Sequence, residues 1–172
     1  TKLDGMDLIS SCANHMNPPL SYIDPSNVST VDVFAGITSV SVGGDSIGGT
    51  ILVNSATPEF ASSEDTTITR AEGGTFYRSN GDATGGNIAA TLANESFSIS
   101  YAGSVAKADN YTAGDDFKTF TATGRNGHTL DLDEVGSSAY DTTNQTLGLA
   151  WRNGAHLVEA RFGWQDVGEQ FF

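Results

Sequence analysis

Three segments in the second half of the chain place their apolar side chains at alternate positions, so that within each segment these residues share one parity. The apolar positions are Phe97, Ile99, Tyr101 and Val105 in the first segment, Leu147, Leu149 and Trp151 in the second, and Val158, Ala160, Phe162 and Trp164 in the third. Successive side chains of a β-strand point to opposite faces, so this period is typical of strands with one apolar and one polar face. The chain from Gly74 onward is therefore predicted to form antiparallel strands.

Two environments suit strands of this kind. In a soluble sandwich the apolar side faces a protein core, whereas in a membrane barrel it faces lipid and the polar side faces a wet lumen. Trp151, Trp164, Phe171 and Phe172 suit either the aromatic girdle of a barrel or a set of core aromatics. The alternation by itself leaves both environments open.

Composition excludes several classes of function. The 172 residues include 21 acidic and 8 basic side chains, a net charge of −13, which would repel a phosphate backbone and argues against nucleic-acid binding. No Ser/His/Asp arrangement, phosphate-binding loop or HExxH motif occurs, so we do not expect an enzyme. The acidic clusters Asp115-Asp116 and Asp131 to Glu134 lack the spacing of a calcium loop.

Residues 31–55 carry a distinctive order of strands and glycines. Val31 and Val33 suggest a short strand, Gly43-Gly44-Asp45 a turn, and Gly48-Gly49 the start of a β-branched strand at 50–53. This order resembles the second half of the plug domain of TonB-dependent outer-membrane receptors. The resemblance implies a transporter that carries a scarce nutrient across the outer membrane of a bacterial cell.

The resemblance also implies a division of the chain. Residues 1–60 would be the C-terminal part of a mixed α/β plug domain, 61–73 the connection, and 74–172 the first antiparallel strands of a transmembrane β-barrel. The expected fold class is therefore mainly β. A barrel of this class closes with roughly 22 strands, so we interpret the chain as part of a larger receptor.

The sharpest local feature is Cys12-Ala13-Asn14-His15-Met16. Positions four residues apart lie on one face of a helical turn, so the Cys12 thiolate and the Met16 thioether could converge there. These soft donors select Cu(I) over hard cations, and His15 is a weaker third candidate. The alternative is that Cys12 is a small buried hydrophobe and Met16 fills a gap in the packing.

The run from Cys12 to Pro25, followed by residues 33–49, is similar to the TonB-dependent copper receptor family. In that family a C-x-x-x-M motif in the plug supplies part of a copper site, which corresponds here to Cys12 and Met16. The family implies three partners: copper as the transported ligand, outer-membrane lipid around the barrel, and the TonB energy-transducing complex. Two alternatives remain: a receptor for an iron chelate or another ligand, and a soluble β-rich binding or adhesion domain.

Overall fold

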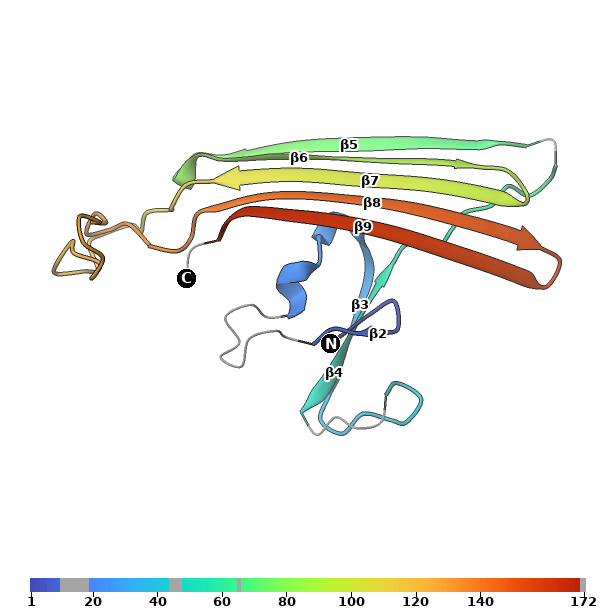
Figure 1. Ribbon diagram of the computed structural model, residues 1–172, viewed down its shortest axis with the longest axis horizontal. Coiled ribbons are helices and arrows are strands. Elements are labelled where there is room, and N and C mark those ends of the chain that lie inside the picture. Colours follow the sequence, from blue (N-terminus) through green and yellow to red (C-terminus); the bar gives the residue numbers. More distant parts are fainter. Residues whose placement is uncertain (10–18, 44–47, 65, 171–172) are drawn as a thin grey trace. The chain divides into compact units, whose positions relative to one another are not determined.

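The computed structural model describes residues 1–9, 19–43, 48–64 and 66–170 (Figure 1). The chain divides into two compact units, Thr1–Glu59 and Phe60–Phe172. Each unit contains one β-sheet, and helical structure in the described residues is limited to short 3-10 turns. The protein is therefore mainly β, as the alternation of its side chains predicts.

The first unit holds a four-stranded sheet with the strand order β2-β1-β4-β3. Its strands are β1 (Lys2–Leu3), β2 (Met6–Asp7), β3 (Val28–Ala35) and β4 (Gly49–Ser55). The β3–β4 pair is antiparallel and contains both strands expected from residues 31–55, whereas β1 lies parallel to β4. Two 3-10 turns, η1 (Pro19–Tyr22) and η2 (Pro25–Asn27), precede β3.

Two local contacts explain how the β3–β4 pair begins. The Asp24 side chain accepts a hydrogen bond from the Ser26 amide and caps η2, which delivers the chain into β3. At the other end Gly49 has a φ of +122°, and a Cβ there would collide with the carbonyl oxygen of Phe34. Glycine is required at this position because the two strands approach closely where they meet.

The second unit is an antiparallel sheet of five strands in sequence order. Its strands are β5 (Ile68–Arg78), β6 (Ala83–Ala93), β7 (Phe97–Ala108), β8 (Tyr140–Asn153) and β9 (His156–Gln170). The three segments predicted from alternation lie in β7, β8 and β9, so this prediction is confirmed. The sheet does not close on itself, because β5 and β9 pair with a neighbour on one side only.

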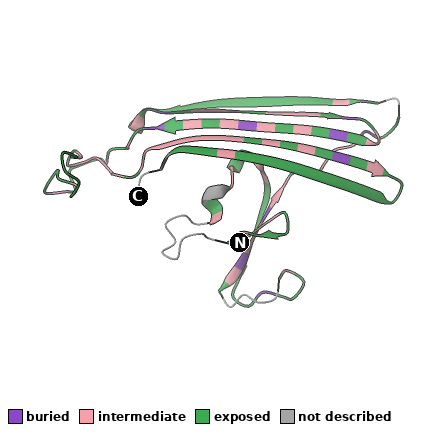
Figure 2. Ribbon diagram, viewed as in Figure 1, coloured by how far each residue is buried: buried purple, intermediate pink, exposed green. Residues whose placement is uncertain are grey.

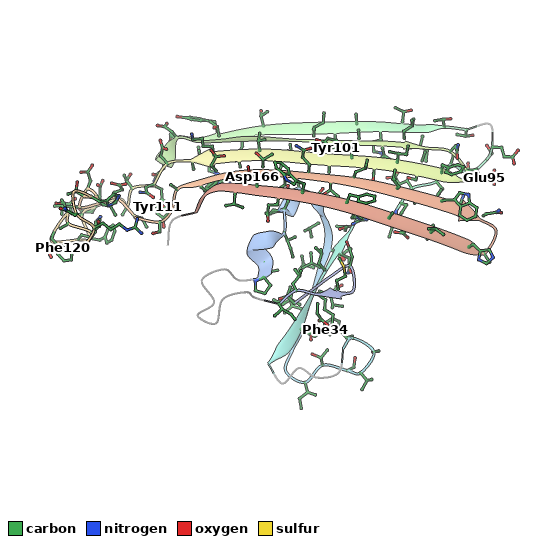
Figure 3. The ribbon with its side chains drawn as sticks, in the orientation of Figure 1. Phe34, Glu95, Tyr101, Tyr111, Phe120 and Asp166 are labelled. Atoms are coloured by element: carbon green, nitrogen blue, oxygen red, sulfur yellow. The ribbon has the colours of Figure 1, made fainter. Side chains whose placement is uncertain are left out.

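The two ends of this sheet differ in the length of their connections. At one end Asn94 to Ser96 join β6 to β7, and Gly154-Ala155 join β8 to β9. At the other end the short turn η3 (Asn80–Asp82) lies beside the long connection 109–139. Figure 3 shows Glu95 at the first end and Tyr111 and Phe120 at the second.

Several sequence-based expectations differ from the structure. A mixed α/β first part is not seen, because the described residues of that unit form strands and 3-10 turns. The first long strand begins at Ile68, within the 61–73 segment expected to be a connection. The segment 134–140 also looks like a barrel strand in sequence, but 134–139 belong to the long connection and only Tyr140 lies in β8.

The tightest hairpin does not lie at the strongest local turn signal of the sequence. Asn126-Gly127 is the strongest two-residue turn signal in the sequence, but only the isolated pair Ala122 and Thr129 bridges around it. The two-residue loop is instead Gly154-Ala155, closed by the pair Asn153 and His156. Gly154 has a φ of +56°, as the first central position of a type II′ turn requires.

Candidate functional site

The predicted copper ligands Cys12 and Met16, together with His15, lie outside the described residues. The nearest described elements are β2 before them and η1 after them. Among the described residues there is no group of three or more His, Cys, Asp or Glu side chains that could hold a metal ion. The copper site therefore remains a prediction from the sequence.

The feature that the structure does describe is an apolar face on the five-stranded sheet. Strand pairing places Phe97 opposite Trp151 and Trp151 opposite Val158, and it places Tyr101 opposite Leu147 and Leu147 opposite Phe162. The same face continues onto β6. Its large apolar members are Ile88, Leu92, Phe97, Ile99, Tyr101, Val105, Leu147, Leu149, Trp151, Val158, Phe162 and Trp164.

All of these side chains are exposed within this chain. Phe162 is 61% exposed, Trp164 55% and Ile88 55%, and the least exposed, Trp151, is still 37% exposed. Among the described residues of the second unit, by contrast, the buried hydrophobic side chains are all alanines: Ala61, Ala83, Ala93, Ala108 and Ala150. The unit thus buries alanines and leaves its large apolar side chains exposed, the reverse of a soluble domain with a packed core.

On β6, β7 and β8 the opposite face of the sheet carries mostly small and polar side chains, and on the edge strands β5 and β9 it also includes Phe76, Leu157 and Val167. On β7 the small and polar residues are Ser98, Ser100, Ala102, Ser104 and Ala106, and on β8 the corresponding positions include Thr142, Asn144, Gly148 and Ala150. Along β7 the side chains therefore alternate between exposed positions on one face and buried or half-buried positions on the other (Figure 2). We call the two sides of this sheet the apolar face and the small-residue face.

The apolar face is bounded by polar groups along the strands. Beyond the row that contains Trp151 lie Asn153 and His156. Toward the long connection, Asp166 follows the last apolar residues on this face, and the next row holds Lys107 and Asp141. The Lys107 Nζ lies 4.0 Å from an Asp141 carboxylate oxygen. A band of apolar side chains thus crosses the middle of the sheet.

Aromatic residues lie near both borders of this band. Trp151 and Phe97 face each other near the hairpin end, whereas Trp164 is two residues from Asp166 on β9. Tyr101 lies between the borders, and a Cβ at Gly103 would be 2.7 Å from its hydroxyl oxygen. Its ring therefore extends along β7 over Gly103, toward the polar end of the strand.

The long connection 109–139 is organised around Asn110. The Asn110 Oδ1 accepts hydrogen bonds from the amides of Ser138 and Ala139, at 3.1 and 3.0 Å. The Asn110 Nδ2 donates to the Glu134 Oε1 at 2.7 Å. Because Asn110 lies just after β7 and Ser138 just before β8, these bonds tie the two ends of the connection together.

Glu134 and Asn80 extend this network. The Glu134 Oε2 accepts from the Asp131 amide at 3.1 Å, and Lys118 donates to the Glu134 carbonyl at 2.7 Å. The hydrogen bond from Asn110, followed by that from Asp131, lowers the pKa of the Glu134 carboxyl. Asn80 joins η3 to the connection by accepting from the Thr112 amide and donating to its carbonyl, both at 2.8 Å.

The fold is similar to that of a solved transporter. The chain matches a structure described as "Copper transporter OprC" with a TM-score of 0.74 and 23% sequence identity. The match covers 96% of this chain and 23% of that one, so the chain spans about a quarter of the transporter's length. At this identity the likeness establishes the fold.

A scan against protein-family models finds no match, and a comparison with curated proteins finds none either. No helix in the described part of the chain is long and apolar enough to cross a membrane.

Proposed function

We propose that this chain is part of a TonB-dependent receptor that imports copper across a bacterial outer membrane. In this proposal the first unit belongs to the plug, and the five-stranded sheet is the beginning of the barrel. An energy-transducing TonB complex would drive the rearrangement of the plug that releases copper inward. The chain would serve as a transporter and not as an enzyme.

The observation that supports a membrane-spanning sheet is its exposed apolar face. Strands β5 to β9 contain 11, 11, 12, 14 and 15 residues. A tilted transmembrane strand needs about 9–11 residues, so each is long enough to cross a bilayer. Apolar side chains toward lipid, small and polar ones toward a lumen, and aromatic residues near both borders are the pattern of an outer-membrane barrel.

The difference between the two ends of the sheet supports an orientation. Barrels of this kind have short turns on the periplasmic side and longer loops outside the cell. The turns at Asn94 to Ser96 and at Gly154-Ala155 would then be periplasmic, and the 109–139 connection would be extracellular. That connection has six acidic and two basic side chains, so it would attract cations.

Copper as the cargo is supported by the soft donor pair at Cys12 and Met16 and by the fold's similarity to a copper transporter. The thiolate carries a charge and the thioether does not, so we expect Cys12 to contribute more than Met16. The remaining ligands would come from outside this pair, since two donors are too few for a tight site. We expect the bound metal to be Cu(I).

Competition titration of the purified complete receptor with a chromogenic Cu(I) chelator tests this proposal. We expect Cys12→Ala to abolish high-affinity binding, Met16→Leu to weaken it, and His15→Ala, at the weakest of the three candidates, to change it little. Unchanged copper stoichiometry and affinity in Cys12→Ala would show that Cys12 is an ordinary thiol. An iron-chelate receptor would then become the better interpretation.

A further inference from the structure

Arg152 contacts two backbone carbonyls and one aromatic ring near the start of the second unit. It is the penultimate residue of β8, and its side chain lies on the small-residue face. Its Nη2 donates to the carbonyl oxygen of Glu95 at 2.9 Å and lies 3.5 Å from that of Ala61. Its guanidinium carbon lies 4.5 Å from the centre of the Phe60 ring.

The backbone completes this arrangement. The Ala61 amide donates to the Asn94 carbonyl at 3.0 Å, and the Arg152 amide donates to the Ser96 carbonyl at 2.8 Å. The Asn94 side chain accepts from the amides of Ser96 and Phe97, which shapes the turn that presents these carbonyls. Ala61 is only 2% exposed, so the chain is enclosed at this point.

A row of small side chains lies on the same face of the sheet, next to the turn at Asn94. Ala93, Ser98 and Ala150 form one row across β6, β7 and β8 on the same face. All three are buried. The row ends next to Asn94 in sequence, whose carbonyl accepts from the Ala61 amide.

Arginine suits this position better than other cations. Its planar guanidinium can stack on an aromatic ring while its N–H groups donate in the plane to carbonyl oxygens. A lysine ammonium also has several donors for carbonyl oxygens, but it lacks the flat surface that lies over the Phe60 ring. The contacts therefore depend on the shape of Arg152 as well as on its charge.

We propose that Arg152 is an anchor that fixes the chain at Phe60 and Ala61 to the small-residue face of the sheet. The boundary between the two units falls between Glu59 and Phe60, directly before the anchored residues. If the first unit moves during transport, the backbone would then change conformation before Phe60. Phe60 and Ala61 would stay attached to the sheet. The anchor lies within the second unit and is independent of which ligand is transported.

Hydrogen exchange of individual backbone amides tests the anchor in the full chain reconstituted in detergent. In Arg152→Gln we expect the Ala61 amide to exchange about tenfold faster or more, because hydrogen bonds from a charged donor are lost. Phe60→Leu, which removes the stacking and keeps the hydrogen bonds, should produce a smaller increase. In Arg152→Lys the Ala61 amide should be better protected than in Arg152→Gln but less protected than in the wild-type protein.

Two references make the result specific. The Asn94 amide donates to the Phe97 carbonyl at 2.8 Å within the turn itself and should remain protected in every variant. Lys107→Gln removes a positive charge at the opposite end of the sheet and should leave Ala61 unchanged. Wild-type exchange at Ala61 in Arg152→Gln would overturn the anchor. Loss of protection at Asn94 as well would also overturn the anchor. Arg152 would then stabilise the β6–β7 turn in general and not the segment at Phe60 and Ala61 specifically.

Discussion

At the scale of single residues, Asn110 holds the long connection in shape. One carboxamide accepts from two amides near β8 and donates to Glu134, so its loss leaves three groups without a partner. We expect Asn110→Ala to increase the exchange rates of the Ser138 and Ala139 amides by about tenfold. Asn126→Ala, in the exposed turn of the same connection, is the control. Equal exchange in both variants would mean that Asn110 does not organise the connection.

Glu134 gives the same connection a pH dependence. Its pKa is lowered in the folded state, so the ionised carboxylate stabilises the connection above the ordinary value of 4.5, and this contribution is lost as pH falls through the lowered pKa. Lys118 also favours the charged form. We expect the amide chemical shifts of Asp131 and Ala139 to titrate together below that value. In Glu134→Gln this transition should be absent, and its persistence would assign it to another acid.

At the scale of elements, the two faces of β9 should respond differently to charge. Phe162 lies in the middle of the apolar band, whereas Gln165 belongs to the small-residue face of the same strand. A lipid-facing arginine near the bilayer midplane costs about 2–4 kcal/mol, so Phe162→Arg should destabilise the protein by that amount in lipid. Gln165→Arg should cost much less. Denaturant unfolding in vesicles measures both, and equal costs would argue against lipid contact on the apolar face.

Strand pairing explains why this apolar face forms at all. Each strand contributes apolar side chains at alternate positions, but a slip of one residue in any pair would move a whole set to the other side. The observed register places Phe97, Trp151 and Val158 in one row and Leu92, Ile99 and Leu149 in another. The tight Gly154 hairpin sets the register of β8 against β9, where a single irregularity occurs between Asp141 and Thr142.

At the scale of the whole molecule, the exposed apolar face predicts how the chain behaves in solution. Contiguous apolar patches beyond a few hundred Å² mark membrane or protein contacts. We expect the chain to associate in aqueous buffer and to become monodisperse in detergent micelles, as measured by light scattering after size exclusion. A folded, monodisperse monomer in buffer without detergent would favour the alternative of a soluble binding or adhesion domain.

The sequence by itself determined the features that depend on near neighbours. Alternation located β7, β8 and β9 and showed which side chains share a face, because a strand's period is set by its own backbone. The glycines and β-branched residues between Val31 and Ser55 likewise located β3 and β4. The C-x-x-x-M spacing at Cys12 and Met16 suggested copper, and the described residues neither place nor test that pair.

Only the tertiary structure decided which distant residues meet. Arg152 reaches the Ala61 carbonyl across 91 positions of sequence, and Asn110 reaches Ala139 across 29. Such contacts depend on strand order, register and the course of the connections, none of which a local pattern specifies. The Asn126-Gly127 signal shows the same limit. A favourable turn sequence makes a long hairpin only where its flanking residues can pair as strands, and the long pairing instead occurs around Gly154, between β8 and β9.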